Sequence, residues 1–141
     1  KYARGFTACM FLNGIQVSCS TFFPSIGKAG KGFSLLKDPH GLVIGAFEYS
    51  KYKEYEIQLE PGDKLFLYTD GVPEAGGTRS NMYGTERMLK TLNSCPDAGP
   101  EELLKKIRAD VDAFVGDEPQ FDDLTMLCLE YKARMAPGGE A

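Results

Sequence analysis

The hydrophobic and polar positions of this chain follow two periods, one typical of strands and one typical of helices. Residues 6–23 are rich in apolar, β-branched and aromatic side chains, and Asn13-Gly14 divides them into two runs. An Asn-Gly pair between apolar runs is a strong signal for a β-hairpin. Residues 54–59 alternate polar and apolar side chains, which predicts a half-buried strand.

Two further runs are apolar at consecutive positions. Residues 65–68 follow the turn at residues 61–63, and residues 124–129 follow a pair of aspartates. Such runs are typical of strands covered on both faces, so we expect both strands to be buried and the first to be central. Residues 33–36 predict another short strand.

The glycine-rich segment at residues 27–32 precedes that short strand. It departs from the phosphate-binding pattern Gly-x-x-x-x-Gly-Lys-Ser/Thr, because Phe33 stands where the lysine is required. We therefore interpret it as a flexible β-turn.

The pattern changes to helical spacing in the second half of the chain. Thr85 is suited to cap a helix that ends at Asn93, and Pro100 is suited to begin a second helix that continues to Phe114 and stops at Gly116. The apolar positions of the second helix recur every 3.6 residues and predict one buried stripe, namely Leu103, Leu104, Ile107, Val111 and Phe114. Strands, two helices and a final strand together predict an α+β fold with helices on a mostly antiparallel sheet.

Composition limits the classes of function. The chain has 141 residues, 43% hydrophobic content and a net charge of −4 with acids and bases interspersed, so no basic stripe favours a nucleic acid or an anionic membrane as partner. No apolar run approaches the roughly 20 residues of a membrane span, and the first residues do not resemble a signal peptide. We expect a cytoplasmic protein.

Cysteine usage agrees with a reducing compartment. The four cysteines lack the Cys-x-x-Cys spacing of a zinc knuckle, so we expect reduced, structural thiols at Cys9, Cys19, Cys95 and Cys128.

Carboxylates stand at the ends of the two continuous apolar runs. Asp70 ends the first run within Thr69-Asp70-Gly71, and Asp122 and Asp123 precede the second. A Thr-Asp-Gly turn by itself is more often structural than metal-binding. If the two strands are antiparallel neighbours, however, these acids come together, and adjacent acids repel each other unless a cation neutralises them. We also expect at least one carboxylate of the Asp122-Asp123 pair to lie close to buried protein.

Hard oxygen ligands of this kind suit Mg²⁺ or Mn²⁺. Such a cation lowers the pKa of a bound water and clamps phosphoryl oxygens, which predicts hydrolysis of a phosphate ester. His40, the sole histidine, lies in a Pro-His-Gly turn and is expected to be an exposed loop residue, with general acid as the alternative role. A hydrolase triad has little support from one histidine.

Several motifs together resemble a known family. These are residues 62–72 with Glu74-Ala75, then residues 83–87 (YGTER), and then residues 120–125 (QFDDLT). They resemble the C-terminal half of the metal-dependent protein phosphatases (protein phosphatase 2C-like), and more narrowly the bacterial SpoIIE branch. Residues 41–45 and 54–59 also match that family, and the resemblance covers about residues 27–131.

The resemblance implies two β-sheets packed between helix layers (an αββα four-layer fold) and hydrolysis of phosphoserine or phosphothreonine on a protein. It implies two Mn²⁺ or Mg²⁺ ions with a bridging water as nucleophile, and Asp70 and Asp122 as metal ligands. Asp123, Gly71 and Thr125 would support the ligands without touching the ions. The substrates implied are phosphorylated anti-sigma-factor antagonists, an association by family alone.

The chain also departs from the family pattern. It lacks the N-terminal Gly-Asp-x-x-Asp motif and an Asp-Gly pair on an early strand, and Gly62-Asp63 is no substitute because it lies at the other end of the Asp70 strand. Residues 19–24 replace an Ala-Gly-His-Asn-Pro-like segment, and only the proline agrees. We therefore expect residues 1–132 to be the C-terminal portion of a phosphatase domain, divergent over residues 1–26, with residues 133–141 as a flexible tail.

Two functions remain open at this point. The chain is either part of a phosphatase, inactive as an isolated fragment, or a non-catalytic phosphatase-like module that binds a protein partner. Residues 73–83 are expected to form a mobile loop. Unpaired strand edges in a truncated fold predict self-association as a homodimer or strand-exchanged oligomer.

Overall fold

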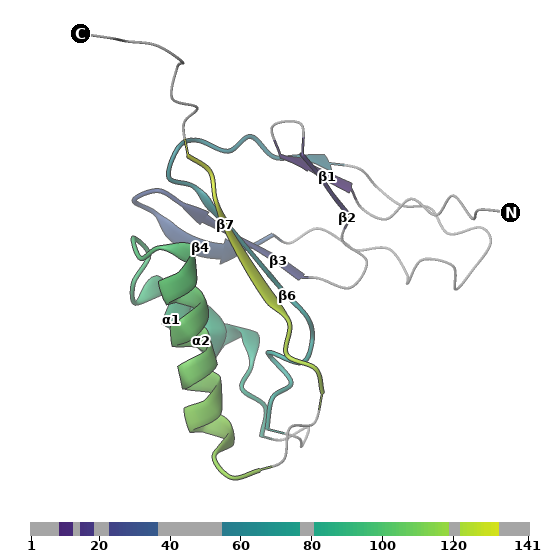
Figure 1. The fold of residues 1–141 in the computed structure, drawn as a ribbon, viewed down its shortest axis with the longest axis vertical. Coiled ribbons are helices and arrows are strands. Elements are labelled where there is room, and N and C mark those ends of the chain that lie inside the picture. The colour runs from purple at the N-terminus through teal and green to yellow at the C-terminus, as the bar shows by residue number, and fades with distance from the viewer. Residues whose placement is uncertain are drawn as a thin grey trace, which may run out of the picture.

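The computed structural model describes residues 9–12, 15–18, 23–36, 55–76, 81–118 and 122–132. Strands come first, two helices follow and a last strand ends the described part, which is the order that the sequence predicts (Figure 1). In chain order the elements are β1 (Cys9–Leu12), β2 (Ile15–Ser18), β3 (Phe23–Lys28), β4 (Gly32–Leu35), β5 (Tyr55–Glu56), β6 (Lys64–Tyr68), α1 (Thr85–Asn93), α2 (Pro100–Val115) and β7 (Met126–Glu130).

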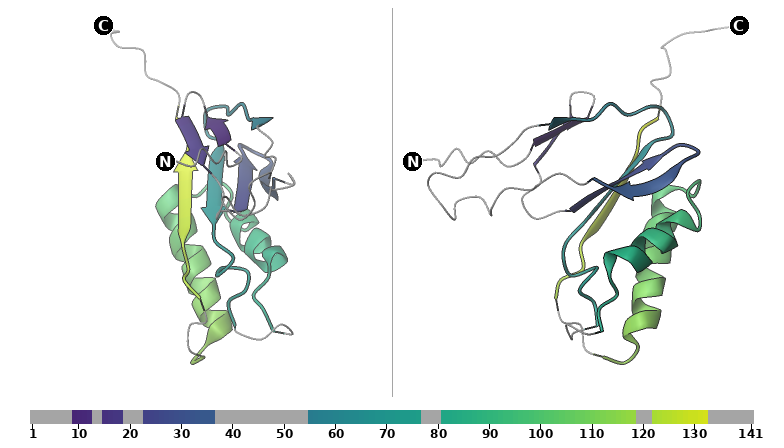
Figure 2. Two further views of the ribbon diagram at one scale, coloured as in Figure 1. Left: turned by 90° about the vertical axis from the view of Figure 1, so that its right-hand side faces the viewer. Right: turned by 180° about the vertical axis from the view of Figure 1, so that it is seen from behind.

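An antiparallel sheet with strand order β4-β3-β6-β7 forms the centre of the molecule. β6 pairs with β7 in a register that sets Lys64 opposite Glu130 and Tyr68 opposite Met126. β6 has neighbours on both sides and all five of its residues are buried, which confirms the prediction of a central strand. The left view in Figure 2 shows strands of this sheet side by side, with the helices on one face.

A smaller sheet has strand order β2-β1-β5. β1 and β2 form the predicted hairpin, with Leu12 opposite Ile15 on either side of Asn13-Gly14. The predicted strand at residues 54–59 is shorter in the structure, because β5 comprises two residues that pair in parallel with β1. Figures 1 and 2 place this sheet away from the helices.

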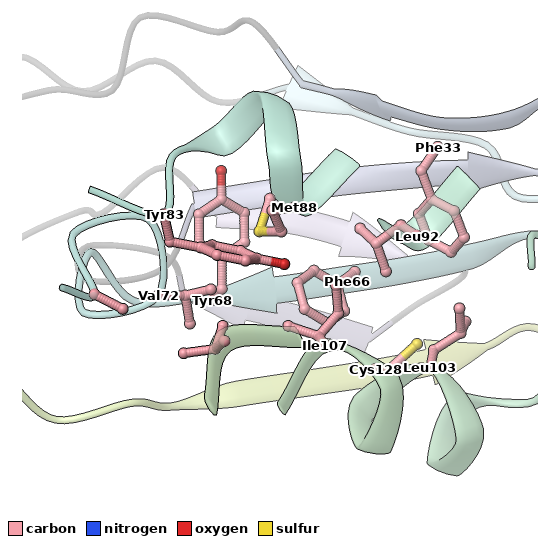
Figure 3. Packing of buried hydrophobic residues seen from close by; sticks show 12 residues of the cluster. Phe33, Phe66, Tyr68, Val72, Tyr83, Met88, Leu92, Leu103, Ile107 and Cys128 are labelled. Atoms are coloured by element: carbon pink, nitrogen blue, oxygen red, sulfur yellow. The ribbon is translucent and has the colours of Figure 1, made fainter. Parts of the chain in front are cut away.

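The main core lies between the four-stranded sheet and the two helices. Figure 3 shows Phe66 and Tyr68 from β6 pointing toward Met88 and Ile107. The predicted stripe of α2 is confirmed, because Leu103, Ile107 and Val111 are fully buried and Leu104 and Phe114 are partly buried. The fold is therefore α+β, as predicted.

The opposite face of the sheet carries a second, smaller core. Leu65 and Leu67 point to this face, where they pack with Ile26 and Leu59. Successive side chains of a strand point to opposite faces, so β6 contributes to both cores. This explains why residues 65–68 are apolar at every position.

The prediction of complete burial is wrong for the last strand. β7 begins at Met126 rather than Leu124, and Leu127 and Leu129 are 45% and 37% exposed. Within the described residues β7 is an edge strand, and its outward face extends beyond the second core. Asp122 and Asp123 are both exposed, so the expectation that one lies against buried protein is also wrong.

Two local predictions need correction. The glycine-rich turn covers residues 29–31 alone, because Gly27 and Gly32 belong to β3 and β4. Thr85 is the first residue of α1 and not its cap; Gly84 occupies the cap position at φ 78°, without a side-chain capping hydrogen bond. α2 runs one residue past Phe114, and Gly116 ends it as predicted.

A buried ion pair anchors the start of β6. Asp63 is 1% exposed, and its carboxylate accepts hydrogen bonds from the Lys28 ammonium (2.5 Å) and from the backbone N–H groups of Ala29 (3.0 Å) and Glu60 (2.9 Å). Burial opposes the charged form, but these donors outweigh burial and hold the pKa of Asp63 below its usual value. From its place in the sequence, Asp63 is expected only to be part of a turn.

The thiols with described side chains are free. Cys128 is buried, and burial raises its pKa to about 11, so it behaves as a small apolar residue. Cys95 is also a free thiol, whereas the side chains of Cys9 and Cys19 lie outside the described part. No helix among the described residues is long and apolar enough to cross a membrane.

Candidate metal centre

The end of β6 and the segment before β7 meet at one edge of the four-stranded sheet. The backbone N–H of Thr69 donates to the carbonyl oxygen of Thr125 (3.1 Å), which continues the antiparallel ladder one step beyond Tyr68 and Met126. The Thr69 hydroxyl donates to the carbonyl oxygen of Asp123 (3.0 Å) and accepts from the Thr125 N–H (3.2 Å). The predicted strand pairing therefore brings the Asp70 and Asp122-Asp123 segments together across a separation of more than fifty residues.

Gly71 is the point of closest approach between the two segments. A Cβ atom at this position would lie 2.5 Å from the carbonyl oxygen of Asp123 and 3.0 Å from its carbonyl carbon, both of which are backbone atoms. Residue 71 must therefore lack a side chain for the two segments to approach this closely. This gives a physical reason for glycine in the Thr-Asp-Gly motif.

The predicted ligands are exposed carboxylates at this junction. Asp70 accepts a hydrogen bond from the N–H of Gly71 (3.1 Å), and Asp122 accepts one from the N–H of Asp123 (2.7 Å). Each local bond fixes one carboxylate oxygen to its own turn. Asp123 and Thr125 contribute to the junction through backbone atoms, and the side chains of both are exposed.

The donor set matches Mg²⁺ or Mn²⁺ in kind, because both residues offer hard, exposed carboxylate oxygens. Among the described ranges, no group of three or more His, Cys, Asp or Glu side chains is arranged to hold a metal ion. Asp70 and Asp122 would thus supply two protein ligands, a number that suits a cation that retains several waters. His40 lies outside the described residues, so its predicted loop position stays a prediction.

A cavity of about 190 Å³ adjoins the junction. Its wall is formed by the turn from Gly71 to Gly76, the last two turns of α2 and the residues around Asp122. Acidic side chains dominate its charge; Arg108 also lines it and is paired with Asp112 at 2.9 Å. Glu74, Arg108 and Glu118 also line the cavity, although the sequence does not mark them as site residues. The apolar stripe of α2 indicates its buried face and not what the end of the helix adjoins.

The turn from Asp70 to Gly76 is held by backbone hydrogen bonds. The N–H of Val72 donates to Thr69 (3.1 Å) and that of Glu74 donates to Asp70 (2.9 Å). Of the predicted loop at residues 73–83, residues 77–80 lie outside the described part, and residues 81–83 lead into α1.

Comparison with known proteins identifies the family. The family described as stage II sporulation protein E (SpoIIE) matches residues 17–132 of the chain. This match covers most of the chain, including both segments of the junction. The chain belongs to the SpoIIE family.

Two curated relatives agree with membership of the SpoIIE family. Protein IcfG of Synechocystis sp. is 29% identical over 89 residues, which are 63% of this chain and 14% of IcfG. The phosphoserine phosphatase RsbU of Bacillus subtilis is 28% identical over 92 residues, which are 65% of this chain and 27% of RsbU. The chain therefore spans a small part of the length of either relative. No solved structure matches the chain.

The family resemblance inferred from the motifs is thus confirmed. The SpoIIE match also covers Arg108 and Asp110, which lie outside those motifs. The roles of Asp70 and Asp122 as ligands, and of Gly71, Asp123 and Thr125 as supporting residues, remain predictions.

Proposed function

We propose that this chain is the C-terminal portion of a metal-dependent phosphoserine or phosphothreonine protein phosphatase, over residues 1–132. The observation that supports the proposal is the junction that brings Asp70 to the Asp122-Asp123 segment beside a cavity. Membership of the SpoIIE family gives this junction a chemical context. We also propose a cytoplasmic location, on the composition given above.

The residues of the junction have distinct roles in this proposal. Asp70 and Asp122 would hold Mn²⁺ or Mg²⁺ through exposed carboxylate oxygens. Gly71 allows the two segments to approach, and the carbonyl of Asp123 fixes their separation through the Thr69 hydroxyl. Thr125 continues the ladder with its backbone, so the junction extends a rigid strand pair. A rigid base suits a site whose ligands must be fixed within a few tenths of an ångström.

The charge of the cavity supports the need for a cation. A phosphoserine carries a charge of about −1.5 to −2 at neutral pH, and the acidic side chains at the cavity would repel it. A bound divalent cation supplies Lewis acidity, which lowers the pKa of a water and neutralises the phosphoryl oxygens. Arg108, which lines the cavity, would then orient the substrate phosphate once it leaves its exposed pair with Asp112.

The substrate class rests on the relatives. RsbU is a phosphoserine phosphatase by name, which favours phosphoserine as the group that is hydrolysed. We propose a phosphorylated anti-sigma-factor antagonist as the substrate. The complete site would hold two ions, and the further carboxylates would come from residues beyond the described ranges or from a longer form of the protein.

The test is turnover of a phosphoserine peptide with Mn²⁺, measured with this chain and with the longest form that its gene encodes. We expect the longer form to be active and the Asp70→Asn and Asp122→Asn variants to lose at least about 10³-fold in kcat, since each removes a charged ligand. Asp97→Asn, an exposed acid between the helices, is the matched control and should keep its activity. A longer form without turnover in Mn²⁺ would refute the proposal.

Calorimetric titration with Mn²⁺ separates this proposal from the alternative of a non-catalytic binding module. The phosphatase predicts binding that Asp70→Asn weakens. Absence of Mn²⁺ binding in the longer form would favour the module.

A further inference from the structure

Asp110 accepts four hydrogen bonds, three from α1 and one from Tyr83, which precedes α1. It lies on α2, and its carboxylate accepts from the Tyr83 hydroxyl (2.7 Å), the Thr91 hydroxyl (2.7 Å) and two guanidinium nitrogens of Arg87 (2.7 and 3.2 Å). Asp110 falls on the flank of the buried α2 stripe, three residues after Ile107. This position is the sequence signal that could have marked it.

The electrostatics of this cluster favour a permanently charged Asp110. The Arg87 guanidinium is the main cause, and it holds the pKa of Asp110 well below the usual range despite partial burial. Burial and the neighbouring carboxylate raise the pKa of Tyr83 to about 12, so its hydroxyl stays protonated and able to donate. Arg87 also lies over the rings of Tyr83 (5.4 Å) and Phe114 (5.0 Å), which fixes the guanidinium plane.

Tyr83 links this cluster to the candidate metal centre. Its backbone N–H donates to the carbonyl of Ala75 (2.9 Å), and the N–H of Gly84 donates to the carbonyl of Pro73 (2.8 Å). Ala75 belongs to the turn that begins at Asp70 and forms one wall of the cavity. A displacement of Tyr83 must therefore move that wall.

Phe114 of α2 packs against both the turn and Tyr83. A Cβ atom on Gly76 would lie 2.8 Å from the Phe114 ring, so the turn fits directly against this ring. The ring of Phe114 in turn meets that of Tyr83 edge-to-face, with centroids 5.8 Å apart. The turn is thus enclosed by side chains whose positions depend on the Asp110 cluster.

We propose that Asp110 is a positioning residue, which acts through Tyr83 and Arg87 to hold the turn from Asp70 to Gly76 and thereby the geometry of Asp70 and of the adjoining cavity. Its relevance to metal binding rests on the proposed function above. Asp110 itself lines a groove between α1 and α2 and does not line the cavity beside Asp122. Its effect on that site must therefore pass through the turn.

A merely structural role would predict something different. If Asp110 only joins α1 to α2, all its donors are equivalent, and losing any one of them should loosen the helix pair alike. If Asp110 holds the turn, the Tyr83 hydroxyl matters more than the Thr91 hydroxyl, although both donate to the same carboxylate oxygen at the same distance. The chain thus offers a matched pair of variants, Tyr83→Phe and Thr91→Val.

The experiment measures backbone amide exchange in the full chain, and the Mn²⁺ concentration for half-maximal turnover in the longest active form. We expect Tyr83→Phe and Asp110→Asn to raise the exchange rates of the Glu74 and Gly84 amides by about tenfold or more, since each removes a hydrogen bond to a charged group. The exchange rate of the Tyr131 amide, which donates to the backbone carbonyl of Asp63 at the other end of the sheet, should not change. Thr91→Val should leave the turn amides unchanged, and the half-saturating Mn²⁺ concentration should rise only for the first two variants.

Three results would overturn the proposal: unchanged exchange at the turn, equal acceleration in Thr91→Val, or acceleration at Tyr131 as well. Unchanged Mn²⁺ dependence with a loosened turn would overturn the link to the metal site. If the unaltered protein neither binds Mn²⁺ nor turns over a phosphopeptide, the proposed function fails. The exchange rates then still decide whether Asp110 holds the turn.

Discussion

The Asp63→Asn substitution tests the buried ion pair at the start of β6. Asp63 is 1% exposed and receives three donors on two carboxylate oxygens: the Ala29 N–H on one, and the Lys28 ammonium and Glu60 N–H on the other. An asparagine has a single acceptor oxygen at this place. One carboxylate oxygen is therefore replaced by an NH₂ group, which cannot accept a hydrogen bond. Its N–H donors then face the donors that the carboxylate oxygen accepted from.

The expected loss of stability follows from these contacts. An unsatisfied buried backbone N–H costs about 1–3 kcal/mol, and a hydrogen bond to a charged group contributes about 1.5–3 kcal/mol. The Lys28 side chain is 38% exposed and regains water, so its share is discounted. We expect Asp63→Asn to lower the free energy of unfolding by about 2–4 kcal/mol, which corresponds to a fall of about 5–15 °C in Tm for a chain of this size.

The assay is thermal unfolding followed by circular dichroism, with Glu60→Gln as the matched control. The Glu60 side chain is exposed, and its change leaves the backbone bond to Asp63 in place. Folding lowers the pKa of Asp63 from its ordinary value of 3.8. The charged carboxylate therefore contributes its full stabilisation above the pKa of the unfolded chain, and this stabilisation is lost as the pH falls through the pKa of the folded chain. The difference between Asp63→Asn and the unaltered chain should therefore be full at pH 7 and shrink below about pH 4. A loss below 1 kcal/mol at pH 7, or a difference that persists undiminished at pH 2, would refute this reasoning.

Two further predictions concern the junction at Gly71 and the exposed edge of β7. Gly71→Ala should destabilise the chain by about 1–3 kcal/mol and weaken Mn²⁺ binding, because the added methyl group collides with the Asp123 carbonyl. Denaturant titration measures the loss of stability. The control Gly99→Ala should show a smaller loss, because its methyl group meets open space. The exposed apolar face of the β7 edge should make the chain self-associate. In sedimentation experiments, Leu127→Lys should reduce this association. An unaltered chain that stays monomeric at high concentration would contradict the prediction.

The sequence predicted the central elements because their local signals agreed with their tertiary surroundings. The Asn-Gly signal matches the pairing of β1 with β2, and the apolar positions of residues 65–68 and of the α2 stripe match their burial. The prediction failed for β7, which carries a similar apolar run to β6 but, in the described part of the chain, pairs with one strand where β6 pairs with two. A run of apolar residues indicates a preference for burial, but other elements must supply the cover.

The candidate site shows the same division. The order of motifs determined that Asp70 and the Asp122-Asp123 pair stand at strand ends, and an antiparallel pairing of those strands was enough to predict their meeting. The sequence could not show that Asp70 and Asp122 are exposed, nor that residue 71 must lack a side chain. Both facts depend on how closely two backbone segments approach that lie far apart in the chain.

The sequence alone thus determined the family, the α+β class and the place of the paired acids, since each rests on short-range patterns and motifs. The tertiary structure alone decided the burial of Asp63, the contacts of Asp110 and the edge position of β7. Each of these depends on residues that are distant in sequence and adjacent in space. Lys28 pairs with Asp63, and Tyr83 donates to Asp110. Among the described strands, β7 pairs with β6 and with no other strand. A polar side chain has no preferred burial until a partner is placed against it, and that placement is made by the fold.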